Sequence, residues 1–182
     1  MKKLDKKAKI LIVVVATIIL SVGGTLAWLE WVSPLNANVY GDVCAPQIVF
    51  VGGNTINGVG ISPTTNLDRA IKKEINVNLQ DLCEDEVATM DLKLELTTFP
   101  VGLADSSFVW KLYKGNTLVT NGNFADKEQG DVITLISGET ITELASNYTL
   151  YIYLDGSVDN PASTQNKSFT FNIYGEGLHA KI

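Results

Sequence analysis

Tyr148-Thr149-Leu150-Tyr151-Ile152-Tyr153-Leu154 predicts secondary structure more clearly than any other run in this chain. Almost all of its residues are aromatic or β-branched, and these types fit the pleated, half-buried surface of a strand. A polar loop from Asp155 to Lys167 follows. Phe169 to Tyr174 then alternates apolar and polar residues, which predicts a last strand, and we expect Gly175-Glu176-Gly177 to end it.

The same period of two occurs upstream. Apolar residues alternate with polar ones at Ile75, Val77 and Leu79 and again at Met90, Leu92, Leu94 and Leu96. Each set predicts a half-buried strand. Phe108 to Tyr113 and Thr117 to Thr120 flank Lys114-Gly115-Asn116, which predicts a β-hairpin with a tight glycine turn.

Other segments give weaker signals. Asn66 is expected to cap a short helical turn before Lys73. Asn121-Gly122-Asn123 is expected to be a turn. Val132 to Ile136 is predicted as a strand that ends before Ser137-Gly138, and the segment 139–145 fits either a strand or one helical turn.

These elements predict the fold class. Seven to nine short strands separated by Gly, Asn, Asp and Pro fit an all-β protein with two packed antiparallel sheets, of the jelly-roll or immunoglobulin-like type. We expect a β-sandwich domain over residues 39–182, preceded by a linker over residues 28–38 that contains Ser33-Pro34.

The N-terminus predicts export. Five lysines and one aspartate precede twenty uncharged residues from Ile10 to Leu29, so the basic side is expected to stay in the cytoplasm. Residues 1–27 are either a signal peptide, with Thr25 and Ala27 at the −3 and −1 positions of a cleavage site after Ala27, or a hydrophobic helix that anchors the chain. Either way the domain is expected to be extracellular or on the cell surface.

The charge of the exported part excludes one class of partner. The full chain has a net charge of −6. Removing residues 1–27, with five basic residues and one acidic residue, leaves 9 basic and 19 acidic residues, or −10. A domain this acidic is repelled by the phosphate backbone, so we expect no nucleic-acid partner.

The two cysteines, Cys44 and Cys83, are predicted to form one disulfide, because an oxidising compartment favours pairing. The alternative is two separate buried thiols. A zinc site is not expected, because neither cysteine has a CxxC partner and the chain has a single histidine, His179.

The residues give no support to catalysis. A Ser–His or Cys–His mechanism requires a histidine, and His179 is expected to lie in a terminal tail where a preorganised base is improbable. No phosphate-binding loop is present in the sequence. We expect no enzyme activity, no catalytic residue and no organic cofactor.

Calcium is the one ion with candidate ligands. Asp155, Ser157 and Asp159 alternate as in the first half of a calcium loop, but no glycine stands at the sixth position and no glutamate closes the loop. A solvated turn rich in Asx residues is the favoured interpretation. A second acidic group, Asp81, Glu84, Asp85 and Glu86, surrounds Cys83 and is expected on a solvated surface.

A family resemblance enters at the end of the apolar run. Gly23-Gly24-Thr25-Leu26-Ala27-Trp28 resembles the G-T-x-A-aromatic signature of bacterial TasA/camelysin-like proteins. The resemblance implies processing by a dedicated signal peptidase and a β-sandwich matrix subunit. It covers residues 10–30, and Leu29-Glu30-Trp31 departs from the Phe and polar residue that usually follow in the family. Camelysin is associated with a protease activity, and no catalytic residue is carried over.

If residues 1–27 are removed, the new N-terminus is Trp28-Leu29-Glu30-Trp31-Val32. This segment is suited to an extended conformation and is predicted to add as a strand to the sheet edge of a neighbour. Addition of this kind from one molecule to the next gives filaments. The leading interpretation is therefore a non-enzymatic surface or matrix protein that associates with itself. The alternative is a membrane-tethered binding module for a protein or glycan partner.

Overall fold

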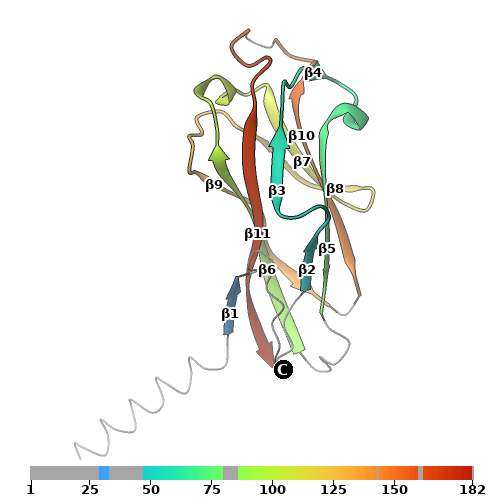
Figure 1. Cartoon of the computed structure of the whole chain (residues 1–182). Helices are drawn as coiled ribbons and strands as arrows, with labels where there is room; N and C mark the ends of the chain where they lie inside the picture. Colours follow the sequence, from blue (N-terminus) through green and yellow to red (C-terminus); the bar gives the residue numbers. More distant parts are fainter. Residues whose placement is uncertain (1–28, 33–46, 80–85, 143, 160–161, 182) are drawn as a thin grey trace, which may run out of the picture.

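The protein is an all-β sandwich of two sheets (Figure 1). The structure is a computed structural model, and it describes residues 29–32, 47–79, 86–142, 144–159 and 162–181. Every strand pair is antiparallel except the two-residue pair between β4 (Pro63–Thr64) and β10 (Ser146–Asp155). The predicted fold class is confirmed at this level.

Sheet I has the strand order β1-β11-β6-β9, with β3 also paired to β11. Its strands are β1 (Leu29–Val32), β3 (Thr55–Gly58), β6 (Glu86–Thr98), β9 (Val132–Ile141) and β11 (Phe169–Lys181). Sheet II has the order β2-β5-β10-β7-β8, with β4 paired to β10. Its remaining strands are β2 (Gln47–Phe50), β5 (Ile71–Asn78), β7 (Phe108–Lys114) and β8 (Thr117–Asn123).

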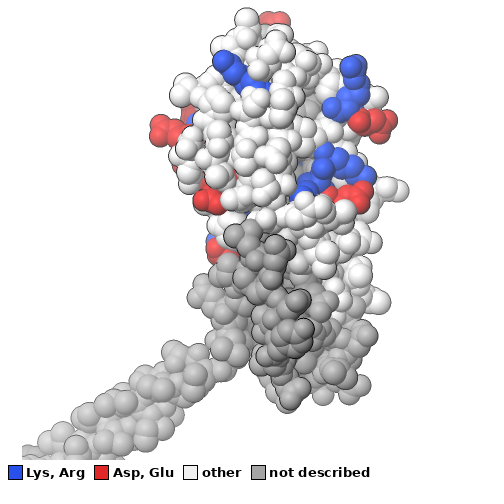
Figure 2. Space-filling model, in the orientation of Figure 1, with Lys and Arg blue, Asp and Glu red and all other residues white. Residues whose placement is uncertain are grey.

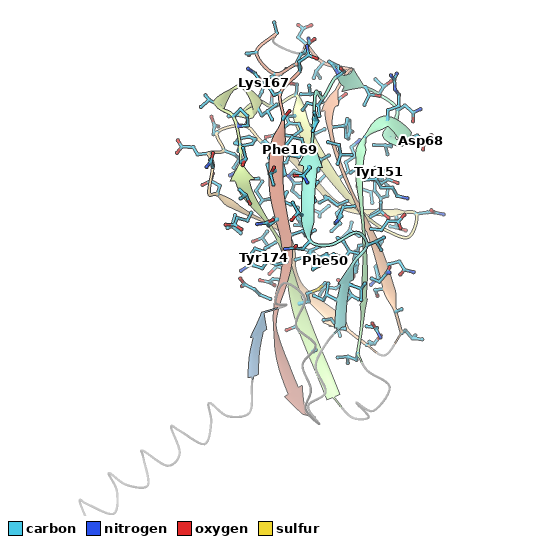
Figure 3. The ribbon with its side chains drawn as sticks, viewed as in Figure 1. Phe50, Asp68, Tyr151, Lys167, Phe169 and Tyr174 are labelled. Carbon is cyan, nitrogen blue, oxygen red and sulfur yellow. The ribbon has the colours of Figure 1, made fainter. Side chains whose placement is uncertain are left out.

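The core lies between the sheets because alternate residues of each long strand point inward (Figure 3). Met90, Leu92, Leu94 and Leu96 of β6 are fully buried, as the sequence predicted. Across the sandwich, alternate residues of β10 are buried from Tyr148 to Leu154. These are the central strands of the two sheets.

One half of the core is aromatic. Five phenylalanines contact one another there, with ring centroids 4.4 Å apart for Phe108 and Phe124 and 4.3 Å apart for Phe169 and Phe171; the fifth is Phe99. They come from both sheets and from the segments that connect them. Large rings that meet in this way bury much apolar area and add pairwise attraction, so this cluster ties the sheets together.

The predicted short elements are also found. Asn66 caps the 3₁₀ turn η1 (Leu67–Arg69), and its side chain accepts a hydrogen bond from the backbone N–H of Asp68 at 2.9 Å. A second 3₁₀ turn, η2, spans Val101–Leu103. The β7–β8 hairpin turns at Gly115, whose φ of 56° is readily adopted by glycine. Among the described residues, no helix is long and apolar enough to cross a membrane.

Two predicted interruptions were wrong. Asn121-Gly122-Asn123 is not a turn but the end of β8, where Gly122 pairs with Trp110 and leaves room for the indole ring. Gly175-Glu176-Gly177 does not end the last strand, because β11 continues to Lys181. In both places pairing with a neighbouring strand outweighs the intrinsic preference of glycine for turns.

The predicted break at Ser137-Gly138 is a bulge within β9. Met90 pairs with Glu139 and Leu92 with Ile136, so two residues of β9 face Asp91. The carboxylate of Asp91 accepts hydrogen bonds from the Ser137 hydroxyl at 2.9 Å and from the Gly138 N–H at 2.8 Å. The strand therefore continues to Ile141, and the helical alternative for this segment was wrong.

Candidate functional site: the edge of β11

The candidate functional site is the outer edge of β11, where the first strand of the structure pairs with the last (Figure 1). Leu29, Glu30, Trp31 and Val32 are antiparallel partners of His179, Leu178, Gly177 and Glu176. These four are residues of the predicted donor strand Trp28–Val32; Trp28 lies outside the described residues. Within one chain, the segment therefore already forms a short strand on a sheet edge.

This edge of β11 is shared between two short strands. β3 pairs with Phe169 to Asn172, and the carbonyl of Asn54 accepts a hydrogen bond from the Ile173 N–H at 2.9 Å. β1 pairs with the second half of β11. The opposite edge of β11 pairs with β6 along nearly its full length. One side of β11 is thus built into the sheet, and the other is covered by short segments.

Charged side chains stand next to the β1 position. Glu176, which pairs with Val32, accepts a short hydrogen bond from the ammonium of Lys93 on β6. This hydrogen bond raises the pKa of Lys93 above its ordinary value. Tyr174 lies two residues away on the same strand (Figure 3), and burial raises its pKa. The ion pair joins β6 to β11, so it stabilises β11 next to the residues that pair with β1.

Figure 2 shows basic and acidic side chains in small groups of both signs on the described part of the face that it draws. Such a surface does not attract partners through a broad field of one sign.

The calcium candidate forms a turn. The carboxylate of Asp155 accepts hydrogen bonds from the Ser157 hydroxyl at 2.6 Å and from the Ser157 N–H at 2.9 Å. The first of these bonds contributes most to lowering the pKa of Asp155. Asp159 is exposed. Among the described residues, no group of three or more His, Cys, Asp or Glu side chains is placed to hold a metal ion. Calcium binding here stays a prediction.

Several predicted features lie outside the described residues. These are the leader through Ala27 with its cleavage site, both cysteines, and the acidic residues 81, 84 and 85. Glu86 is described as the first residue of β6. The disulfide between Cys44 and Cys83 and the removal of the leader remain predictions.

The expectation of a terminal tail around His179 was wrong. His179 belongs to β11 and pairs with Leu29 on one side and with Ala88 on the other. This was missed because Gly175-Glu176-Gly177 was expected to end the strand after Tyr174. For the same reason Glu176 to His179 were not recognised as the partner of the donor segment. The thirteen-residue length of β6, which matches that of β11, is the feature that accommodates this longer pairing.

Two further polar groups were missed. Glu139 of β9 accepts hydrogen bonds from Lys114 at 2.6 Å and from the Tyr148 hydroxyl at 2.8 Å, which joins sheet I to sheet II. Lys73 points into the sandwich, and its ammonium donates to the carbonyl of Thr55 at 3.2 Å. Lys73 is only 7% exposed, and burial lowers its pKa.

No protein-family model matches the chain, and no curated protein matches it. The resemblance to TasA/camelysin-like proteins therefore rests on residues 10–30 of the sequence and stays a prediction.

Proposed function

We propose that this protein is an exported, non-enzymatic structural protein of the cell surface or extracellular matrix, and that it assembles by exchanging its N-terminal strand between molecules. The observation that carries the proposal is the β1–β11 ladder, in which Leu29–Val32 pairs with Glu176–His179. In the assembly, the same four residues add to β11 of the next molecule and leave their own β11 edge to a third.

Exchange costs little pairing energy because it replaces each contact with an identical one. The cross-strand partners are the same within one chain and between chains, so the net change in pairing energy is small. The 14 residues from 33 to 46 connect β1 to β2. A connection of that length spans at most about 46–50 Å when extended, which is enough to reach an adjacent domain. Head-to-tail exchange that does not close into a ring gives filaments.

The leader supports export. Five lysines before a long apolar run are typical of a signal peptide or an N-terminal hydrophobic helix. Cleavage after Ala27 would free Trp28 and the strand that follows. An uncleaved helix would hold the strand next to the membrane and make the protein a tethered binding module for a protein or glycan partner. A jelly-roll or immunoglobulin-like arrangement of the two sheets belongs to the same proposal.

Mixed cysteine variants test the exchange directly. One preparation carries Glu30→Cys and a second carries Leu178→Cys, both with Cys44 and Cys83 replaced by serine, and the two are mixed under mild oxidation. The adjacent pair Trp31→Cys and Gly177→Cys is tested in parallel, because antiparallel pairs alternate between wider and closer spacing. Strand exchange predicts a disulfide between the two chains for at least one of these pairs.

The matched control replaces Leu178→Cys with Thr170→Cys, on the half of β11 that pairs with β3. It should give no more crosslinking than random collision. A second test keeps the native cysteines: deletion of residues 28–33 should abolish filaments in protein recovered from the producing cells. Filaments that persist after this deletion, together with crosslinking equal to that of the control, would overturn the proposal.

The N-terminus of the protein from fractionated cells separates the two forms of the proposal. A start at or near Trp28 in the medium or matrix favours the assembling subunit. An intact leader in the membrane fraction favours the tethered module.

A further inference from the structure

Two glycines inside strands lie directly opposite aromatic residues of a neighbouring strand. Gly122 of β8 pairs with Trp110, and Gly58 of β3 pairs with Phe169. A Cβ at position 122 would lie 2.7 Å from Cζ2 of Trp110, and a Cβ at position 58 would overlap the ring of Phe169. Both rings are buried. In each pair the ring therefore occupies the space that a side chain on the glycine would need.

The β1–β11 ladder contains a third pair of this kind. The register places Trp31 of β1 opposite Gly177 of β11. On the other side of β11, Gly177 pairs with Met90 and Gly175 pairs with Leu92. Met90 and Leu92 are fully buried. Residues directly opposite one another share a face of the sheet, so both glycines lie on the face of sheet I that is turned to the core.

A strand that contains glycines depends on its neighbour for packing. Glycine in a strand interior has no side chain to pack and weakens the strand. A large aromatic residue on the neighbouring strand compensates for this loss. The pairs at Gly122 and Gly58 show the compensation twice in this molecule. In the third pair the glycine belongs to the long strand β11 and the aromatic residue to the short edge strand β1, so the aromatic residue moves with the strand that is exchanged.

We infer that the Trp31–Gly177 pair selects the strand that this edge of β11 accepts. Backbone hydrogen bonds supply affinity for any extended segment, and the positions of alternate side chains supply specificity. The edge accepts a strand that carries a large aromatic residue opposite Gly177. Its occupant is Leu29–Val32 of the same chain or of a second copy. Selection of a second copy rests on the proposed function, whereas selection within one chain does not.

Hydrogen exchange of the full chain measures whether β1 is paired, because backbone amides in a ladder exchange slowly. Trp31→Ala should speed the exchange of residues 29–32 by about tenfold or more, since a large aromatic residue contributes strongly to strand pairing. Trp31→Phe should restore most of the protection. The matched control is Leu29→Ala, which truncates an apolar residue of the same strand at a position opposite His179. It should have a clearly smaller effect than Trp31→Ala.

Substitution of Gly177 tests the other half of the pair. Gly177→Val introduces a β-branched residue, which strand preference alone would favour. The inference predicts faster exchange of residues 29–32, because the new side chain takes the space opposite Trp31. Combining Gly177→Val with Trp31→Ala should speed exchange by less than the product of the two single effects, since residues that act as a pair are not additive. Asn172→Val, in the part of β11 that pairs with β3, should leave residues 29–32 unchanged.

Mixed cysteine preparations separate this inference from the proposed function. Trp31→Ala is added to the Glu30→Cys chain, which is then mixed with the Leu178→Cys chain, and the disulfide between chains should form more slowly. Disulfides that form as readily with Trp31→Ala as without it leave strand exchange standing and overturn the selection by Trp31. If no disulfide forms between chains but exchange of residues 29–32 depends on both members of the pair, the proposed function fails and the selection holds within the chain.

The hydrogen-exchange results also decide the inference without the crosslinks. Equal effects of Trp31→Ala and Leu29→Ala, or effects of Trp31→Ala and Gly177→Val that simply multiply, overturn it. Fast exchange of residues 29–32 in the unmodified chain overturns it as well. The Trp31 variants decide the outcome if Gly177→Val fails to fold.

Discussion

The hydroxyl of Tyr148, on β10, donates a hydrogen bond to the carboxylate of Glu139, on β9, at 2.8 Å across the sandwich. The same oxygen of Glu139 accepts from Lys114 at 2.6 Å, and the Lys114 ammonium lies 5.5 Å from the centre of the Tyr148 ring. Tyr148 is 1% exposed. This is a polar connection between the two sheets, in which Tyr148 is buried and Lys114 and Glu139 stay partly exposed.

Glu139→Gln should destabilise the fold by about 1–2 kcal/mol, because hydrogen bonds to a charged acceptor are worth more than those to a neutral one. Hydrogen bonding from Lys114 is the main cause that lowers the pKa of Glu139 from its ordinary value of 4.5. A lowered folded-state pKa contributes stability above pH 4.5, and this contribution is lost as the pH falls through the folded-state pKa. Urea unfolding at pH 7 and in a series below pH 4.5 measures both effects.

The control for Glu139→Gln is Glu74→Gln, which breaks the exposed ion pair with Lys72. It should change the unfolding free energy by less than about 0.5 kcal/mol. An equal effect of the two substitutions would contradict the role assigned to Glu139.

Lys73→Met should stabilise the protein by about 1 kcal/mol at neutral pH, because a buried ammonium with one carbonyl partner costs free energy that a methionine does not. Burial lowers the pKa of Lys73 from 10.5, so the native state binds fewer protons than the unfolded state as the pH rises towards 10.5. The stability of the unmodified protein should therefore rise with pH between the lowered pKa and 10.5. Lys73→Met should remove this rise.

The exposed neighbour Lys72 supplies the control. Lys72→Met should keep the dependence on alkaline pH that Lys73 causes. Thermal unfolding over a pH series measures how stability changes in the alkaline range. If the stability of Lys73→Met rises with pH as much as that of the unmodified protein, the burial of Lys73 does not cause the rise.

Gly122→Ala should destabilise the fold by about 1–3 kcal/mol, because the new methyl group would lie 2.7 Å from the indole of Trp110 and must displace it. The displacement should also change tryptophan fluorescence. Asn121→Ala, on the same strand but exposed, should leave both the stability and the emission nearly unchanged.

Cys44 and Cys83 should form one disulfide. Gln47 and Asn78 are direct partners on β2 and β5. Cys44 lies three residues before Gln47, and Cys83 lies five residues after Asn78, so both chain segments leave the same end of sheet II. Closing a loop of about 40 residues is worth roughly 4 kcal/mol. Mass spectrometry of the unreduced protein should find no free thiol, and reduction should lower the melting temperature. A variant with both cysteines replaced by serine should not respond to the reductant.

The sequence predicted the strands whose burial alternates within a few residues. Ile75 to Leu79 and Met90 to Leu96 have the expected pattern of burial. One face of a half-buried strand contacts the core and the other contacts solvent, so apolar and polar residues alternate in the local sequence. Extending the first alternation back by two residues places Lys73 inside the sandwich. A lysine is read as a surface residue unless its neighbours are known, so this position was missed.

The glycines were misread for a physical reason. Glycine disfavours a strand interior, so Gly122 and Gly175 indicated turns. In the fold, a large ring packs beneath Gly122, and Gly175 pairs with Leu92 inside an extended ladder. These contacts come from distant parts of the chain. For the same reason the partner of Leu29–Val32 was not predictable, because register between remote strands leaves no local signal.

The β1–β11 pairing affects the order in which the strands can pair during synthesis. Its partners are separated by 144 positions, from Val32 to Glu176, up to 150, from Leu29 to His179. A chain made from its N-terminus produces Leu29–Val32 before the other described strands and β11 after them. Until β11 has been made, β1 lacks the partner that it has in the folded chain, and contacts between such remote positions form slowly. During this interval β1 can pair with β11 of a folded neighbour before it pairs within its own chain. The rate of export and the local concentration of folded molecules would therefore set the ratio of closed monomers to strand-exchanged molecules.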